Sequence, residues 1–152
     1  MAVAADPHPH AHHVRDYPSP RAPLAIHPLH AVVLAGTLPL LLGALLTDLA
    51  YRASHQIQWS NFASWLIVGA MVLVGVALVF ALVDLFRAGK GRGVPYFVLL
   101  VVTFALGVVN ALVHGQDAWA IMPEAVVLSA VVFLLACVAT WLGFSGYRRG
   151  AP

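Results

Sequence analysis

The sequence predicts an all-α membrane protein, a four-transmembrane-helix bundle with up-down-up-down topology and both termini in the cytoplasm. Three observations lead to this fold class. The 152 residues are 61% hydrophobic and 9% charged, with a mean hydropathy of +0.88. Four apolar stretches follow one another along the chain, each near the ~17–25 residues that a helix needs to cross ~30 Å of hydrocarbon. The basic residues are divided unevenly between the two sides that these stretches define.

The composition also argues against several classes of protein. An average soluble domain is about 25% charged and about 45–50% apolar, so a water-soluble globule is not expected. The length excludes a large enzyme with separate cofactor and substrate domains. Cys137 is the only cysteine, which excludes an intrachain disulfide, a CxxC motif and a cysteine zinc site. A formal net charge of +2 is too small for a nucleic-acid-binding surface.

The expected spans form a single domain over about 26–149, and Pro28 fits the first turn of its first helix, where a missing N–H costs nothing. The first 25 residues contain five prolines and the run HPHAHH but no apolar stretch. We therefore expect a disordered Pro/His-rich tail. The tail lacks the apolar region of a signal peptide, which predicts that the first span is not cleaved. The four spans cover about 31–51, 62–86, 96–113 and 125–147.

The orientation follows from the basic residues. Seven of the eight Lys and Arg residues lie beside the termini or between the second and third spans, and Arg52 alone lies on the other side. The positive-inside rule then places both termini in the cytoplasm, in a bacterial plasma membrane. An aromatic group near the opposite interface is typical of a membrane protein and consists of Trp59, Trp65, Trp119 and Tyr51.

Small and polar residues at helical spacing predict the faces through which the spans pack together. The third span carries a stripe with a period of 3.5 residues, which we expect to face the bundle interior. Its members are Thr103, Gly107, Asn110, His114 and Asp117. The corresponding faces of the other spans are His30, Thr37, Ala44 and Tyr51 with Asp48 and His55 on the adjacent row, then Ala63, Ala70, Ala77 and Asp84, and then Ser129, Ala136 and Gly143.

The topology gathers the polar side chains of the spans into two groups. The cytoplasmic group is His27, His30, Asp84 and Arg87, and the outer group is Asp48, Arg52, His55, Asn61, Asn110, His114 and Asp117. Ionisable groups within spans are costly, by about 2.5–3.5 kcal/mol at the bilayer centre, and are therefore functional candidates. The structural alternative is that Asp48 pairs with Arg52, and Asp84 with Arg87, to stabilise helix ends.

Asn110 and His114 lie one helical turn apart on the interior stripe. They either form an interhelical hydrogen bond or ligate haem iron or another metal. Haem b is the leading cofactor candidate, and His55 with His114 is the pair at matched depth, because His30 lies at the opposite side of the bilayer. The tail run HPHAHH is a further candidate for a metal ion. The sequence contains no nucleophile–base pair, phosphate-binding loop or HExxH motif, so we do not expect an enzyme.

Four runs follow one another along the chain: IHPLH at 26–30, TDLAY at 47–51, NALVHGQD at 110–117 and GFSGYR at 143–148. Together they resemble the bacterial membrane family called domain of unknown function 2231, and the resemblance extends over about 24–149. The resemblance implies a four-span membrane domain without an established activity. Some relatives are joined to c-type cytochrome or Rieske iron–sulfur modules, which implies a redox setting. Many relatives have a second His-Pro step where this sequence has His30-Ala31.

These observations predict an integral inner-membrane protein that acts as a partner or anchor subunit. It would contact the lipid bilayer and either a membrane or redox protein or a second copy of itself. The alternative is a membrane redox protein that binds b-type haem or a metal through His55 and His114. A channel or transporter normally has polar groups near the midplane, where the sequence offers only Cys137 and the threonines Thr37, Thr103 and Thr140.

Overall fold

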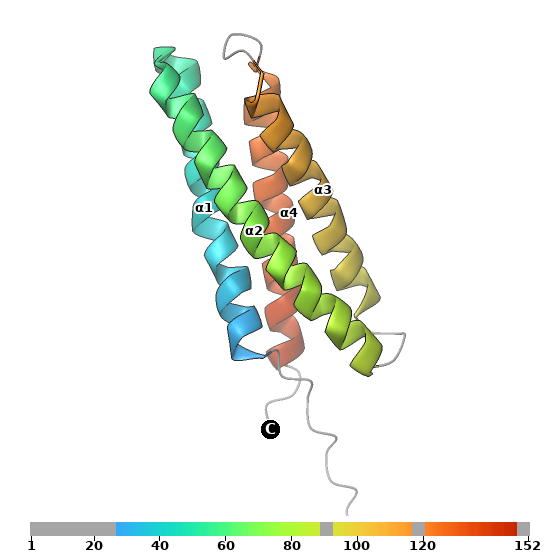
Figure 1. Ribbon diagram of the computed structural model, residues 1–152. Coiled ribbons are helices and arrows are strands. Elements are labelled where there is room, and N and C mark those ends of the chain that lie inside the picture. The colour runs from blue at the N-terminus through green and yellow to red at the C-terminus, as the bar shows by residue number, and fades with distance from the viewer. Residues whose placement is uncertain (1–26, 89–92, 117–120, 149–152) are drawn as a thin grey trace, which may run out of the picture.

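A computed structural model describes residues 27–88, 93–116 and 121–148, and within these ranges it contains four helices and no strand. The helices lie side by side, and successive helices run in opposite directions (Figure 1). All four are long and apolar enough to cross a membrane, which confirms the predicted all-α fold with four membrane-spanning helices. The cytoplasmic position of the termini stays a prediction. The helices are α1 (Pro28–Ser54), α2 (Ile57–Ala88), α3 (Val94–His114) and α4 (Glu124–Arg148).

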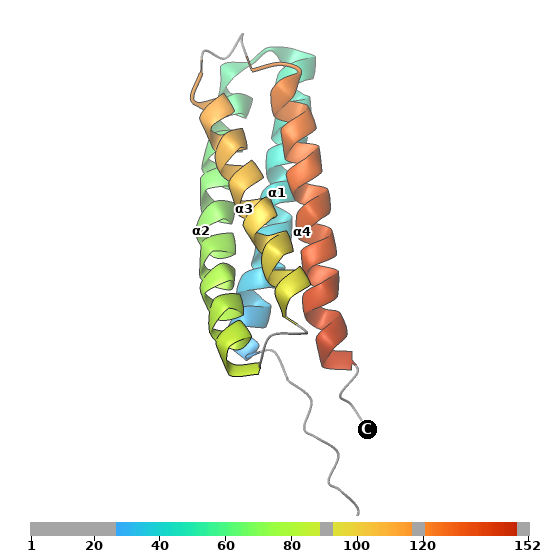
Figure 2. The same ribbon diagram turned by 90° about the vertical axis from the view of Figure 1, so that its right-hand side faces the viewer.

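The bundle is a square in cross-section. Both α1 and α3 pack against α2 and against α4, so α1 lies diagonally opposite α3 (Figure 2). We call the end where α1 leads into α2, and α3 into α4, the Asp48 end. The opposite end, where α1 begins and α4 ends, is the His30 end.

The helices extend beyond the expected apolar spans at every terminus. The largest difference is at α2, which begins at Ile57 and includes the polar residues before Phe62. Hydropathy marks the part of a helix that lies in hydrocarbon, whereas backbone hydrogen bonds and caps decide where the helix ends. Pro28 occupies the first turn of α1 as predicted, and the His27 side chain caps this helix by accepting a hydrogen bond from the Leu29 N–H at 3.3 Å. The predicted tail, its HPHAHH run, Asp117 and Trp119 lie outside the described residues.

The interior of the bundle combines small residues with large apolar side chains such as Leu41, Ile67 and Leu100, and further large apolar residues cover its outside. Several alanines are at most 2% exposed: Ala44, Ala63, Ala70, Ala77, Ala136 and Ala139. Gly36 and Gly43 let α1 approach α2 closely, because an added Cβ atom would lie 3.2 Å from Leu73 and 3.1 Å from Leu66. Close backbone approach through small residues is the usual way in which helices associate in lipid.

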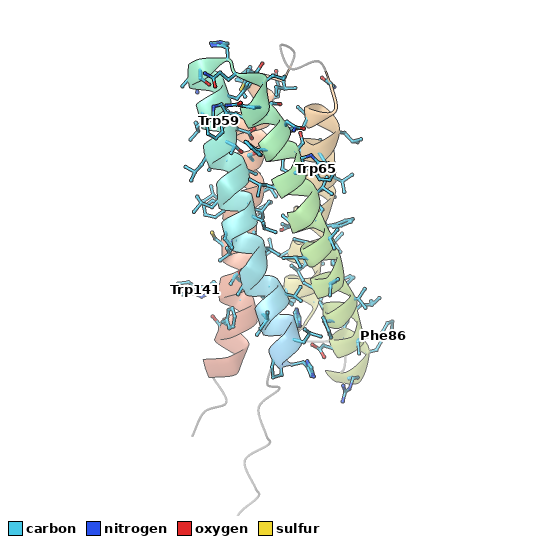
Figure 3. All side chains as sticks on the ribbon, turned by 60° about the vertical axis from the view of Figure 1, so that its left-hand side comes forward. Trp59, Trp65, Phe86 and Trp141 are labelled. Atoms are coloured by element: carbon cyan, nitrogen blue, oxygen red, sulfur yellow. The ribbon has the colours of Figure 1, made fainter. Side chains whose placement is uncertain are left out.

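Large aromatic side chains project from the outside of the bundle near both ends. Trp65 is 71% exposed, Trp141 75% and Phe86 80%. Trp59 and Trp65 lie toward the Asp48 end, and Trp141 and Phe86 lie toward the His30 end (Figure 3). Aromatic residues at the two membrane–water interfaces anchor a protein in the bilayer, so this arrangement fits a bundle that crosses the membrane lengthwise.

The predicted interior faces are mostly confirmed. In α3 the residues Thr103, Gly107, Asn110 and His114 are buried, as the stripe predicted. The α2 face is correct at its three alanines and wrong at Asp84, whose side chain is 55% exposed. A carboxylate near a helix end stays hydrated when it points outward. Burying it between helices would cost the free energy of this hydration, so Asp84 does not continue the buried face.

Candidate functional site

Four side chains from three helices form a buried hydrogen-bonded group at the Asp48 end, which we call the Asp48 network. It consists of Asp48 from α1, Asn110 and His114 from α3, and Ser129 from α4. The exposed fraction is 0% for Asp48 and Asn110, 1% for Ser129 and 8% for His114. The network therefore links α1 to α3 across the diagonal of the bundle and also includes α4.

Asp48 is the centre of the network because each of its carboxylate oxygens has a partner on another helix. Its Oδ1 lies 2.8 Å from His114 Nε2. Its Oδ2 accepts a hydrogen bond from the Ser129 hydroxyl at 2.5 Å. Ser129 Oγ in turn accepts a hydrogen bond from Asn110 Nδ2 at 2.9 Å. A buried carboxylate is tolerated in an apolar surrounding only with such partners.

The backbone of α3 fixes the tautomer of His114. Its Nδ1 lies 2.9 Å from the main-chain oxygen of Asn110, one turn earlier in the same helix. A carbonyl oxygen can only accept, so Nδ1 carries a hydrogen and donates it. The other ring nitrogen, Nε2, is thereby directed toward α1 and Asp48.

This arrangement corrects the expected pairing of Asp48 with Arg52. Arg52 is exposed on the outside of α1, whereas both oxygens of Asp48 bond to other helices. A buried carboxylate gains more from partners inside the bundle than from an exposed ion pair on its own helix, which is worth about 0.3–0.5 kcal/mol.

A second polar group, the His30 cluster, lies at the opposite end and also crosses the diagonal. His30 is 1% exposed, and its Nε2 lies 2.9 Å from the Tyr96 hydroxyl of α3. Its Nδ1 lies 3.8 Å from Asp84 Oδ2 and has no hydrogen-bond partner within the described part of the chain. The rings of His27 and His30 both stack with Phe80, at centroid distances of 6.1 Å and 5.4 Å.

The two groups show that α1 and α3 are in register along their length. His30 and Tyr96 are 66 residues apart, and so are Asp48 and His114. Both helices run from the His30 end to the Asp48 end (Figure 1), so equal separations at both ends mean equal depths.

A polar pocket of about 370 Å³ opens at the Asp48 end and reaches the network at His114. Amide and hydroxyl side chains dominate its lining, and Asn61 of the expected outer group is one of them. The lining residues are Ile57, Gln58, Ser60, Asn61, Ser64, His114 and Gln116.

The structure places the two candidate haem ligands differently. His114 has both ring nitrogens in hydrogen bonds, so ligation of iron through Nε2 would replace its bond to Asp48. His55 is exposed at the C-cap of α1, in the left-handed conformation with φ of 56°, and its ring centroid lies 6.4 Å from that of Tyr51. This arrangement does not present two free nitrogens to one iron, and haem ligation by this pair stays a prediction. Within residues 27–88, 93–116 and 121–148, no group of three or more His, Cys, Asp or Glu side chains is arranged to hold a metal ion.

Two residues of these groups were not identified as functional by the sequence. Ser129 was expected only as a small residue of a packing face, and Tyr96 was not singled out. The useful signal for both is depth, because Ser129 begins the fourth span near Asp48 and Tyr96 begins the third near His30.

The comparison with known families covers all four helices. A family model described as "Predicted membrane protein (DUF2231)" matches residues 26–148. No curated protein and no solved structure is similar enough to the chain to match it. The family match agrees with the four apolar helices of the structure. The chain therefore belongs to the DUF2231 family of predicted membrane proteins, whose function is unknown.

Proposed function

We propose that this protein is a partner subunit of the bacterial plasma membrane, and that it binds a transmembrane helix of a second membrane protein between α2 and α3. The observation that supports this proposal is an apolar groove of about 560 Å³ on the outside of these two helices. The groove is lined by Val68, Met71, Val72, Gly75, Val76 and Val79 of α2 and by Phe104, Val108, Ala111 and Leu112 of α3.

The dimensions of the groove suit a helix. Its α2 positions follow the spacing i, i+3, i+4, i+7, i+8 and i+11, which is one continuous helical stripe from Val68 to Val79. At 1.5 Å per residue this stripe is about 16 Å long, or about three helical turns. Helix-in-groove recognition uses apolar anchors with this same periodicity.

The residue types of the groove favour a helix over a lipid chain. Gly75 and Ala111 are small, so the backbone of a partner helix can approach closely. Valine side chains in a helix have essentially one rotamer and lose little entropy when a partner covers them. Val72 and Val79 are each 62% exposed, so this preordered surface is open in the isolated chain.

The orientation of the subunit is part of the proposal. The seven basic residues beside the termini and between the second and third spans support a cytoplasmic His30 end. The groove lies between the aromatic groups of the two ends, so its partner must be an apolar helix that crosses the same bilayer.

Site-specific photo-cross-linking in the native bacterial membrane tests the proposal. A photoreactive residue replaces Val72 or Val108 in the groove, and Leu134 on α4 provides the control. Leu134 is matched because it is 62% exposed, as Val72 is. We expect a discrete cross-linked product from both groove positions and none from Leu134, with a second membrane protein identified by mass spectrometry.

The other occupants of the groove give different results. A product of twice the mass of the chain would assign the groove to a second copy. Lipid adducts alone, or equal products from all three positions, would contradict the proposal. Gly75→Leu should abolish the protein product from Val108, because its side chain fills the space that the partner helix needs, whereas Gly75→Ala should preserve it.

A further inference from the structure

We infer that the Asp48 network is a binding site for one exchangeable proton, held between His114 Nε2 and Asp48 Oδ1, and that this proton joins α1 to α3. The inference is independent of the proposed partner role. It follows from the hydrogen bonds of the network, because all other hydrogens there have assigned positions.

The count of hydrogens begins at the two ends of the network. Asn110 donates from its amide to Ser129 Oγ, so the Ser129 hydroxyl hydrogen is directed to Asp48 Oδ2. Oδ2 is therefore an acceptor. His114 donates from Nδ1 to the Asn110 carbonyl. The contact that remains is the 2.8 Å contact between Nε2 and Oδ1, and a hydrogen bond there requires one proton.

Any other number of protons breaks this contact. With none, the lone pair of Nε2 faces a carboxylate oxygen and a net negative charge stays buried. With two, the Nε2–H and the carboxylic O–H point at each other and a net positive charge stays buried. Both side chains of the pair are 0% exposed, and an uncompensated charge at such a site is strongly unfavourable. The contact between α1 and α3 is thus tied to a single proton.

The other titratable residues on the described helices at this end are the groups that could share the proton of the His114–Asp48 pair. On α1, Tyr51 is buried, whereas Arg52 and His55 are exposed. On α4, Glu124 is exposed. The first eight residues of α2 contribute amide, hydroxyl, indole and apolar side chains. On α3, His114 is the titratable residue of this end within the described range.

While the His114 side chain itself is 0% exposed, the polar pocket brings water next to it on one side. Its amide and hydroxyl groups can hydrogen-bond to water beside His114. Toward the His30 end the interior contains buried apolar residues such as Leu41, Ile67 and Leu100. The buried hydroxyls of Thr37 and Thr103 in this region donate to carbonyls of their own helices. Exchange of the proton therefore follows the pH of the compartment at the Asp48 end.

The decisive variant is Asp48→Asn in the full-length protein, reconstituted in lipid nanodiscs. An asparagine amide can accept from Ser129 through its oxygen and donate to Nε2 through its nitrogen, so it completes the same bonds without a shared proton. We expect the thermal stability of the wild type to fall toward both ends of a range from about pH 5 to about pH 9. Asp48→Asn should lose this dependence. His30→Gln, at the other end of the bundle, is the matched control and should retain it.

Nuclear magnetic resonance of ring-¹⁵N-labelled histidine measures the proton directly and does not depend on the variant folding. The His114 signals are assigned by their loss in His114→Gln. We expect Nδ1 to be protonated throughout and Nε2 to show a proton shared with Asp48. An unprotonated Nδ1, or coincident stability curves for the wild type and a folded Asp48→Asn, would overturn the inference.

Access from one side has its own test in a Cys137→Ala background. A cysteine at Ser64, in the polar pocket, should react with a membrane-impermeant thiol reagent added at the Asp48 side. A cysteine at Val72, in the apolar groove, should not react. An unreactive Ser64→Cys would show that the pocket is dry and would overturn the proposed exchange route.

Discussion

The two ends of the bundle carry the same kinds of side chain and differ in how completely they are bonded. Each has a buried histidine on one diagonal helix that contacts a side chain of the other. That side chain is the carboxylate of Asp48 at one end and the Tyr96 hydroxyl at the other, where the nearest carboxylate, Asp84, lies on α2. At the Asp48 end the carboxylate is fully buried and both histidine nitrogens are bonded. At the His30 end the carboxylate of Asp84 is 55% exposed and lies 3.8 Å from His30 Nδ1. The histidine–carboxylate pair at the Asp48 end is closed, in that both side chains are 0% exposed. The pair at the His30 end is open, because the carboxylate of Asp84 is hydrated.

The largest difference between the two ends is expected when the carboxylate of each end is removed in turn. Asp48→Ala leaves Ser129 and His114 without their acceptor, and loss of one partner of a buried pair typically costs about 3–5 kcal/mol. Asp84→Ala should cost less than about 1 kcal/mol, because exposed ion pairs contribute little. Reversible unfolding in mixed detergent measures both. Equal losses in the free energy of unfolding would show that the carboxylate contributes equally to stability at the two ends.

A smaller effect is expected from removing one arm of the closed network. Asn110→Leu removes the hydrogen bond to Ser129, and we expect a loss of about 0.6–2 kcal/mol in the free energy of unfolding. Thr103→Val is the control, because the Thr103 hydroxyl donates to the Leu99 carbonyl of its own helix. Stability of Asn110→Leu at or above that of wild type would contradict the assigned bond.

His114→Gln sharpens the distinction between a structural histidine and a metal ligand. A glutamine amide can still donate to Asp48, so we expect a loss of only about 1 kcal/mol. Metal analysis and the visible spectrum are compared for wild type, His114→Gln and His114→Ala. Stoichiometric haem or iron in the wild type that is absent from His114→Ala would establish the redox alternative.

The smallest effect is expected at the open end. Tyr96→Phe removes the hydrogen bond to His30 Nε2 and should cost about 0.6 kcal/mol, the average for a polar contact between membrane helices. His30 then retains its stacking with Phe80. A loss as large as that of Asp48→Ala would mean that the His30 cluster is as closed as the Asp48 network.

The fold and the interior faces of the helices could be predicted because hydropathy and spacing are properties of one helix at a time. The stripe through Thr103, Gly107, Asn110 and His114 is buried as the spacing indicated. Depth was predictable as well, since the alternating direction of the spans makes the first and third parallel and brings Asp48 and His114 to the same end of the bundle.

The partners of these residues could not be predicted, because they depend on the rotation and approach of separate helices. A carboxylate at Asp48 can meet a side chain on its own helix, on a neighbour or across the diagonal, and spacing does not distinguish these. The structure selects the diagonal partner His114 together with Ser129 of the neighbouring helix. Asp84 was wrongly predicted for a different reason. Its spacing continues the buried face of α2, but near the helix end the carboxylate stays in water.

The shared register of α1 and α3 has a mechanical consequence. Their two contacts, His30 with Tyr96 and Asp48 with His114, lie eighteen residues apart on each helix, which is about 27 Å of helix. Two contacts at that distance hold the two parallel helices at both ends. Sliding either helix along its axis by one residue, about 1.5 Å, would strain both contacts together. The two contacts therefore fix the relative depth of α1 and α3 at both ends of the bundle.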